Sequence, residues 1–523
     1  SRSSQPALAM PPKRSASRGR SPSPAKRGGR GKSPAASPKT PRGRTPTKSP
    51  ARSKSPAPRA AGRASSSPAP RSAPKAAPHT KSWSMSKANS SLWELAGPVG
   101  LIISPPITVI VLTYALLKLD GSALKLGEEF VKDFPSILWR VHPSIHEMME
   151  AMKVVVVFWA VQLAMMPLVP GKIHTGPVAP SGHRPKYKAN GVATYILTVI
   201  LFFLGAHLGF YKAGIFYYIA APMYAALNYF SLVFCAFLHV KGLYFPSTKD
   251  SGSTGSVIFD YFWGTELYPR IGKKFWSIGW DLKQFTNCRW GMMFWAIGTL
   301  SFMMAQAELK GMPYDSMFIS VFVQQVYVFK FFLWETGYLN TMDIQHDRAG
   351  FYICWGCLVW VPCLYTCHTL FLVEHTIQLG AVTSAVMGAV GFVAVYINWD
   401  ADQQKTNFRE KNGDVEIWGR KATKIVATYR TDLGINKQSL LLTSGWWGLS
   451  RHFHYLPELL AAFCWTAPTL WSGSVLGFTY WVFLLLLLTH RSFRDEERCS
   501  TKYGAYWEEY KRLVPYRIVP YVF

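Results

Sequence analysis

Residues Gly473–Thr489 read GSVLGFTYWVFLLLLLT and give the clearest indication of the fold class. It contains no charged residue, and its length is close to the roughly 20 residues that an α-helix needs to cross a bilayer. A polar, charged segment, HRSFRDEERCSTKYGAYWEEY, follows directly and occupies His490–Tyr510. The sequence therefore predicts a membrane-spanning helix that leads straight into a charged segment.

Comparable apolar runs recur along most of the chain. Hydrophobic residues make up 49% of the sequence and charged residues only 16%, whereas about a quarter of a soluble protein is charged. Hydropathy therefore predicts an all-α, polytopic membrane protein with about ten transmembrane helices. The expected spans lie near residues 97–119, 152–170, 192–211, 213–240, 291–308, 316–336, 351–373, 380–398, 455–471 and 473–490.

Residues 1–90 differ from the rest because Ser, Pro, Arg, Lys, Ala and Gly dominate them. They hold 21 Lys and Arg but no Asp or Glu, which leaves only +7 of the net charge of +28 for the remaining chain. Such a composition predicts a disordered tail ahead of a membrane domain over residues 91–523. The tail either makes weak, charge-driven contacts with nucleic acid or anionic lipid or is a solvated spacer.

The distribution of basic residues predicts the orientation of the spans. An even number of spans puts both termini on one side of the membrane. The basic tail and the Lys- and Arg-containing segments 405–430 and 491–517 indicate that this side is the cytosol.

The eight cysteines indicate neither a disulfide framework nor a metal site. Most lie in apolar stretches without the spacing of extracellular proteins. Cys354 and Cys357 form a C-x-x-C pair, and Cys363, Cys367 and His368 follow. The polar groups that orient metal ligands are missing around them. We therefore expect these thiols to pack between membrane helices, and we predict no metal site.

Ionisable side chains beside apolar spans are candidates for function. The densest group lies in residues 334–347, where Glu335, Asp343 and His346 are candidate proton donors. Tyr365 and His368 lie within an expected span. The alternatives are an interfacial loop with solvated charges and a tyrosine that only packs. A transporter is disfavoured, because the two halves of the chain show no internal repeat.

Charged and aromatic residues after the last span recur with helical spacing. On one helix they would share a face; they are Asp495, Cys499, Lys502 or Tyr503, Tyr506 and Tyr510. Lys405 and Arg409, also one turn apart, suit phosphate groups, while Trp447 and Tyr455 can stack on a flat ring. These residues favour a phosphorylated, ring-containing cofactor at the cytosolic mouth of a helical bundle; the alternative is ordinary basic loops. No Gly-rich fingerprint follows a strand, so we expect no Rossmann domain.

Two long motifs in the chain from about Leu95 resemble the sterol reductases. The first is GSVIFDYFWGTELYPR at residues 255–270, in which Tyr268 replaces the Asn usual in the family. The second comprises LTHR at 488–491, Arg494-Asp495, Cys499 and KYG at 502–504. Four shorter strings resemble the branch that reduces 7-dehydrocholesterol, in its plant and algal form: YKANG at 187–191, WETGY at 334–338, HDRAGFY at 346–352 and SGWWG at 444–448.

The resemblance implies ten transmembrane helices, an endoplasmic-reticulum membrane and NADPH as the reductant. It also implies cofactor contacts at Lys405, Arg409, Leu442, Trp447, His454, Tyr455, Asp495, Cys499, Ser500, Thr501, Lys502, Tyr503 and Tyr510. His454 departs from the Asn of the animal members, so the chemistry of one contact is altered.

The implied activity is NADPH-dependent reduction of the C7–C8 double bond of a sterol 5,7-diene. An acid must protonate the alkene while the nicotinamide supplies hydride. The acid is expected to be Tyr365, or else Glu335 and Asp343 acting through a hydrogen-bonded group. The alternatives are a C14-sterol reductase and a nuclear-envelope protein that tethers chromatin through its basic tail. The oligomeric state stays open.

Overall fold

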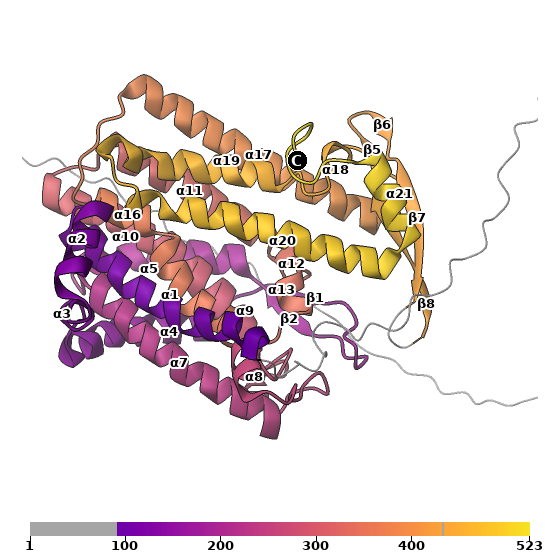
Figure 1. The fold of residues 1–523 in the computed structure, drawn as a ribbon, viewed down its shortest axis with the longest axis horizontal. Coiled ribbons are helices and arrows are strands. Elements are labelled where there is room, and N and C mark those ends of the chain that lie inside the picture. The colour runs from indigo at the N-terminus through magenta and orange to yellow at the C-terminus, as the bar shows by residue number, and fades with distance from the viewer. Residues whose placement is uncertain (1–91, 431–433) are drawn as a thin grey trace, which may run out of the picture. The chain divides into compact units, whose positions relative to one another are not determined.

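The computed structural model describes residues 92–430 and 434–523. The predicted disordered tail, residues 1–90, lies outside the described residues. The described chain is mostly helical, and Figure 1 shows the helices packed lengthwise against one another. This arrangement confirms the all-α fold class expected from hydropathy.

In the first half of the described chain, α1, α4 and α8 pack against α7, whereas α5 and α6 pack mainly against helices of the second half. α1 and α4 both contact α7 along its length. The helices of this half are α1 (Leu92–Lys118), α2 (Ala123–Asp133), α3 (Ile137–Arg140), α4 (Ile145–Leu168), α5 (Gly191–His207), α6 (Ile215–Tyr218), α7 (Ala220–Tyr244), α8 (Val257–Trp263) and α9 (Leu282–Gln284).

The second half adds the helices that later enclose the candidate site. α17 packs on α11 and α19, and α19 packs on α20. The α-helices are α10 (Met292–Lys310), α11 (Asp315–Leu333), α12 (Glu335–Tyr338), α13 (Met342–Gln345), α14 (Phe351–Trp355), α15 (Val361–Leu364), α16 (Cys367–Leu372), α17 (Ala381–Glu410), α18 (Trp446–Leu449), α19 (Tyr455–Thr466), α20 (Thr479–Tyr503) and α21 (Ala505–Leu513).

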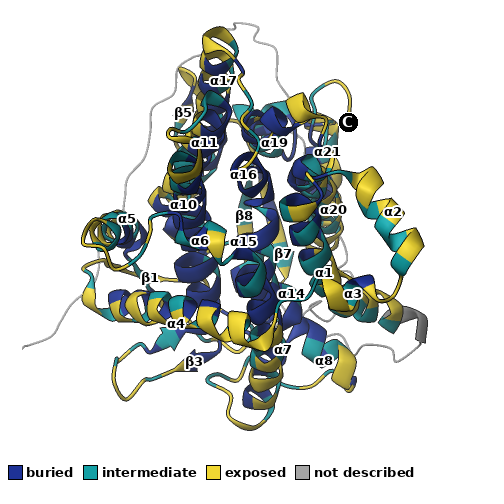
Figure 2. Ribbon diagram, turned by 90° about the vertical axis from the view of Figure 1, so that its left-hand side faces the viewer, coloured by how far each residue is buried: buried dark blue, intermediate teal, exposed yellow. Residues whose placement is uncertain are grey.

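Seven helical segments among the described residues are long and apolar enough to cross a membrane. They are Leu95–Lys118, Ile145–Leu168, Ala220–Tyr244, Asp315–Leu333, Phe351–Leu372, Ala381–Glu410 and Leu476–Tyr503. The three other expected spans also coincide with helices, α5, α10 and α19. In Figure 2, exposed residues cover the outward faces of α2, α4 and α7, while buried residues face the interior.

Four two-stranded antiparallel sheets occur among the described residues. The longest is the hairpin of β7 (Lys424–Arg430) and β8 (Asn436–Leu442), in which Lys424 pairs with Leu442. The others are β1 (Lys172–Thr175) with β2 (Lys186–Ala189), β3 (Arg270–Ile271) with β4 (Trp280–Asp281), and β5 (Glu416–Ile417) with β6 (Arg420–Lys421). In Figure 1, β5–β8 and α21 gather at the same end as the charged half of α20.

Local sequence explains where several helices begin. At α4, the Ser144 hydroxyl accepts from the Glu147 amide and the Glu147 carboxylate accepts from the Ser144 amide, which is a capping box. At α17, the Asp315 carboxylate accepts from the amides of Leu379 and Gly380, at 3.0 and 2.8 Å. This carboxylate satisfies amides that a helix leaves free at its N-terminus.

Two stretches of π-helix interrupt the helical segments near the centre of the chain. They are η2 (Phe285–Gly291) and η3 (Gly356–Trp360). The expected span 351–373 is therefore not one regular helix but the series α14, η3, α15 and α16. π-Helical turns occur often at functional sites, and both stretches contribute to the cavity described below. Short 3-10 turns, η4 (Ala467–Ser472) and η5 (Leu476–Phe478), join α19 to α20.

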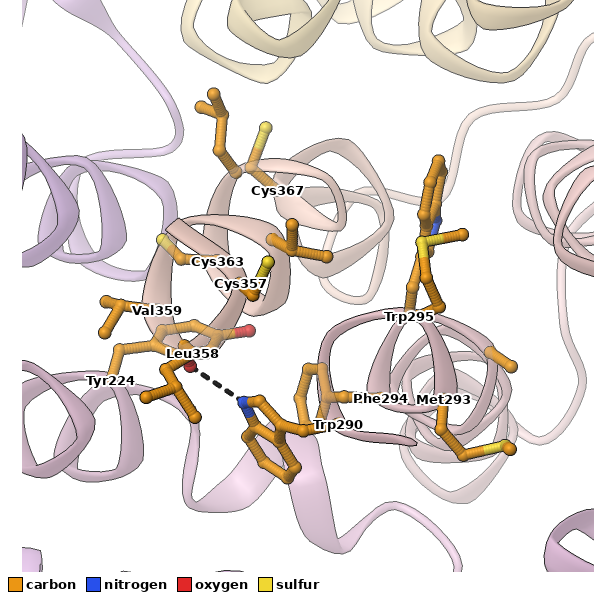
Figure 3. Close-up of a cluster of buried hydrophobic side chains, with 14 of the residues drawn as sticks. Tyr224, Trp290, Met293, Phe294, Trp295, Cys357, Leu358, Val359, Cys363 and Cys367 are labelled. Atoms are coloured by element: carbon orange, nitrogen blue, oxygen red, sulfur yellow. Dashed lines mark hydrogen bonds between the residues drawn. The ribbon is translucent and has the colours of Figure 1, made fainter. Parts of the chain in front are cut away.

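The cysteines around η3 are buried in the main hydrophobic core. Figure 3 shows the Cys357, Cys363 and Cys367 side chains leaving the helix in different directions, among apolar neighbours. Trp290 donates to the Leu358 carbonyl at 2.9 Å in the same cluster. Within residues 92–430 and 434–523, no three His, Cys, Asp or Glu side chains come together as metal ligands would.

Candidate active site

A cavity of about 1190 Å³ lies among the second-half helices. Its wall includes residues of α10, α11, α17, α19, α20 and α21, together with η3 and β8. One end is polar, and the other is lined by aromatic and aliphatic side chains, including Trp295, Tyr480, Phe483 and Leu487. Pockets for a single small molecule are usually 300–1,000 Å³, so this cavity is large enough for a cofactor together with a substrate.

The structure brings most of the predicted cofactor residues to this cavity although they come from distant parts of the sequence. Those that line it are Lys405, Arg409, Leu442, Trp447, His454, Tyr455, Asp495, Cys499, Tyr503 and Tyr510. Ser500, Thr501 and Lys502 do not line it. Lys502 instead places its ammonium over the Tyr429 ring, 4.3 Å from the centroid.

Lys405 and Arg409 supply positive charge at the polar end. They lie one turn apart on α17, and neither forms an ion pair with any residue that the structure describes. The Lys405 ammonium lies 3.6 Å from the centroid of the Trp447 ring. A pair of cations without carboxylate partners is suited to phosphate groups.

Aromatic rings surround this charge. The Trp447 indole N–H donates to the Ala401 carbonyl of α17 at 2.8 Å, which fixes the ring against that helix. His454 lies 4.9 Å from Trp447 and 4.3 Å from Tyr455, measured between ring centroids. Burial and the nearby Lys405 hold the pKa of His454 well below its usual value, so the ring is neutral. Its buried Nδ1 has no hydrogen-bond partner in the described protein and is available to a ligand.

The predicted single helical face from Asp495 to Tyr510 is wrong in one respect. α20 ends at Tyr503 and α21 begins at Ala505, because Gly504 takes a positive φ of 53° that L-residues rarely adopt. The Tyr510 hydroxyl donates to the Trp447 carbonyl at 3.3 Å. The site therefore uses one face of α20 and one face of α21, joined at a turn.

Residues 514–518 close the polar end by hydrogen bonding to the segment before α19. Arg451 donates from its guanidinium to the carbonyls of Val514 and Pro515, at 2.9 and 2.8 Å. The Ser450 hydroxyl donates to the Ile518 carbonyl at 2.7 Å, and the His452 amide donates to the Arg517 carbonyl at 2.8 Å. Residues 450–452 are thus held in place by a segment that follows every helix in the described part of the chain.

The residues expected to supply the acid, Tyr365, Glu335 and Asp343, are placed differently. Tyr365 lines the cavity, with its ring 5.1 Å from Trp295 and 4.7 Å from Tyr480 between centroids. Glu335 lies outside the cavity wall. It is 2% exposed, forms a 2.7 Å ion pair with the fully buried Arg289 and accepts from the Gly191 amide at 2.7 Å. Its carboxylate is thus engaged in packing α5 and α12 together.

Asp343 lines the cavity, but as the partner of a cation. Both of its oxygens accept from Arg491 of α20, at 2.8 and 2.9 Å. Arg494, one turn further along, pairs with the buried Asp347. The Arg491 guanidinium occupies both carboxylate oxygens, so Asp343 is better suited to hold α20 in place than to contact a substrate.

Lys283 supports the loop that carries these two carboxylates. Its ammonium donates to the backbone carbonyls of Asp343, Ile344 and Asp347, at 3.2, 2.7 and 2.7 Å. Burial lowers the pKa of Lys283 to about 8. His346, in the same loop, does not line the cavity, and burial lowers its pKa to about 4. The loop is therefore a positioning element for α20.

Two cavity residues were not predicted, Tyr327 on α11 and Glu458 on α19. The Tyr327 hydroxyl donates to Glu458 Oε1 at 3.0 Å, and both side chains line the cavity. The signal that could have found Glu458 is an acidic residue within the otherwise apolar run 455–466, because such residues are costly in a membrane and usually functional.

Comparison with known proteins gives a consistent relationship over the membrane domain. Residues 99–523 match the model of the "Ergosterol biosynthesis ERG4/ERG24 family". The chain is 44% identical over 435 residues to an Arabidopsis thaliana protein named 7-dehydrocholesterol reductase, which covers 83% of this chain and 99% of that protein. It is 36% identical over 363 residues to the Danio rerio protein of the same name, covering 69% and 74%.

A relative of another name is also similar. The Delta(14)-sterol reductase of Methylotuvimicrobium alcaliphilum is 36% identical over 362 residues, which cover 69% of this chain and 81% of that protein. The family match covers all the helices from α2 to α21 and every residue assigned to the cavity's polar end. On the matches to the family model and to these relatives, the chain belongs to the ERG4/ERG24 family of membrane sterol reductases.

Proposed function

We propose that this chain catalyses the NADPH-dependent reduction of the C7–C8 double bond of a sterol 5,7-diene in sterol biosynthesis. The observation that carries the proposal is the cavity that joins a cationic, aromatic end to an apolar end. The two relatives named for 7-dehydrocholesterol support the choice of double bond.

The polar end of the cavity fits NADPH. Lys405 and Arg409 offer unpaired charge for phosphates, and Trp447 and Tyr455 offer rings for stacking. The free Nδ1 of His454 supplies a polar contact in place of the Asn amide of animal members. When bound, NADPH supplies the hydride.

The apolar end fits the fused rings of a sterol. Its aliphatic and aromatic side chains exclude water and leave few polar groups to compete with the substrate. Tyr365 and Tyr327 present hydroxyl groups there. The chain's own residues thus bind both molecules, exclude water between them and hold a proton beside the alkene.

Microsomes that contain this protein give a direct test. They receive NADPH and either 7-dehydrocholesterol or a C8,C14-diene, and the products are separated by mass spectrometry. We expect reduction of the C7–C8 bond in the first sterol. Exclusive reduction of the C14 bond would instead assign the chain to the activity named for the bacterial relative.

We also propose an endoplasmic-reticulum location with both termini in the cytosol. Basic residues gather in segments 405–430 and 491–517, and the positive-inside tendency places such segments on the cytosolic side. Residues 1–90 form a separate tail in this proposal, with charge-driven contact to anionic lipid or nucleic acid. Reticular staining and cleavage of the tail by external protease on intact microsomes are the expected results. Nuclear-rim staining that depends on residues 1–90 would favour the chromatin tether.

A further inference from the structure

Tyr327 and Glu458 form a hydrogen-bonded acid pair in the wall of the cavity, near Lys330 of the helix that carries Tyr327. The Tyr327 ring packs 5.4 Å from both Trp295 and Trp465 between centroids, which holds its hydroxyl beside the Glu458 carboxyl. The helices that carry the pair, α11 and α19, pack directly on each other. The pair is therefore held by rigid elements and faces the space assigned to the sterol.

The structure contains comparable pairs that serve as an internal reference. Tyr218 donates to Glu308 at 2.9 Å and Tyr217 donates to Glu374 at 2.7 Å. Neither of these pairs lines the cavity. In the part of the chain that the structure describes, Tyr327 is the tyrosine that both lines the cavity and hydrogen bonds to a carboxyl group.

We propose that Tyr327 protonates the sterol double bond and that Glu458 resupplies its proton. This inference rests on the proposed function and adds the source of the proton. The Tyr327 O–H bond breaks as one alkene carbon gains a C–H bond, and NADPH, when bound at the polar end, would supply the hydride that the other carbon needs. The phenolate left at Tyr327 then takes the proton of the Glu458 carboxyl, and water at the polar end reprotonates Glu458.

Polar side chains connect this pair to the mouth of the cavity. Lys330, one turn after Tyr327 on α11, donates to Asn398 Oδ1 at 2.5 Å and to Asp402 Oδ2 at 3.0 Å. Asp402 precedes Lys405 by one turn of α17, and all of these side chains line the cavity. They give water and protons a polar route between the cofactor end and Glu458.

Tyr365, the donor expected from the sequence, lacks such a supply. Within residues 92–430 and 434–523 its hydroxyl has no hydrogen-bond partner, although its ring packs on Trp295 and Tyr480. After one donation a phenolate at Tyr365 would have no adjacent acid to restore it. This difference in hydrogen bonding favours Tyr327 as the catalytic residue, with Tyr365 shaping the apolar wall.

The test compares Tyr327→Phe, Glu458→Gln and Glu458→Asp in purified full-length protein. General acid catalysis contributes about 10²- to 10⁴-fold, so we expect kcat to fall at least 100-fold in Tyr327→Phe and Glu458→Gln. KM and the NADPH dissociation constant should change less than about threefold, because neither residue supplies most of the binding surface. Glu458→Asp should recover part of kcat. Tyr218→Phe and Glu308→Gln are the matched controls and should retain wild-type kcat.

Two further readouts separate proton supply from a structural role. The wild-type rate should fall at alkaline pH as the pair ionises, and this limb should vanish in Glu458→Gln. The charged and titratable groups facing Glu458 are acidic, basic and phenolic side chains from five elements. They are Tyr327 and Lys330 of α11, Tyr365, Asp402 of α17, Tyr455 of α19, and Tyr480 and Arg491 of α20. Infrared difference spectra should show a protonated carboxyl band that Glu458→Gln removes and Tyr327→Phe shifts.

The outcomes are distinguishable. A wild-type protein that reduces neither diene contradicts the proposed function. A wild-type protein that reduces the C7–C8 bond, together with near wild-type kcat in Glu458→Gln or Tyr327→Phe, overturns the acid pair alone. Loss of chemistry in Tyr365→Phe with retention in Tyr327→Phe would assign the proton to Tyr365. Retained NADPH binding shows that each variant is folded.

Discussion

Lys405 allows a quantitative test of the cofactor end. Its ammonium lines the cavity over the Trp447 ring and has no ion-pair partner among the described residues. A hydrogen bond to a charged group contributes about 1.5–3 kcal/mol. The substitution Lys405→Met removes the charge and keeps most of the apolar stem, so NADPH affinity should fall about 10- to 150-fold.

The stability of the folded protein should rise slightly or stay unchanged in Lys405→Met, although its affinity for NADPH falls. No carboxylate loses its partner in Lys405→Met, and the desolvation cost of a half-buried cation disappears. Only the cation–π contact with Trp447 is lost, which is about 0.5–2 kcal/mol. We therefore expect the melting temperature of the cofactor-free protein in detergent to stay within a few degrees of wild type.

The assay is titration with NADPH and NADH, followed by cofactor fluorescence. A loss confined to NADPH would place the 2′-phosphate at Lys405, and an equal loss for both cofactors would place the diphosphate there. Lys411→Met is the matched control, because Lys411 follows α17, is exposed and does not line the cavity. Unchanged affinity for both cofactors in Lys405→Met would falsify the assignment of a phosphate site.

Three further perturbations test other parts of the structure. Glu335→Gln leaves the buried Arg289 without its carboxylate partner, so it should cost about 3–5 kcal/mol of stability while the folded enzyme keeps its turnover. Loss of turnover in folded protein would instead assign Glu335 a role as a proton relay. Gly504→Ala forces a side chain into a positive φ of 53°, which should cost about 1–3 kcal/mol of stability and weaken NADPH binding. The control Gly311→Ala, also at positive φ between helices, should lower stability without changing NADPH affinity. Equal NADPH affinity in the two variants would contradict the role of the turn. Burial lowers the pKa of His452 to about 4 from 6.5. The neutral ring therefore contributes fully to stability above about pH 6.5, and up to about 3 kcal/mol of the free energy of unfolding is lost as pH falls towards 4. Chemical unfolding as a function of pH should show this slope in wild type but not in His452→Gln.

Hydropathy predicted the helices well because it measures the length of an apolar run, which the bilayer fixes. It could not predict that residues 351–372 divide into α14, η3, α15 and α16, because a π-turn depends on packing rather than on composition. Helical spacing likewise placed Asp495 and Cys499 on one face of α20. It missed the turn at Gly504, although glycine is the residue that such a turn requires.

The site was predicted only in part, for a related reason. The cations at Lys405 and Arg409 stand out in sequence, and the family motifs pointed to the rest of the polar end. Glu335 also stands out, but its partner Arg289 is distant in sequence, so its structural role is visible only in three dimensions. Tyr327 and Glu458 come from different helices, and their contact is a property of packing.

The tie between residues 450–452 and residues 514–518 has a consequence for biogenesis. All the described helices precede this segment in the chain, yet the polar end of the cavity lacks these hydrogen bonds until the segment is made. A chain stalled or cut between α20 and residue 514 would therefore be inserted but unable to close its site.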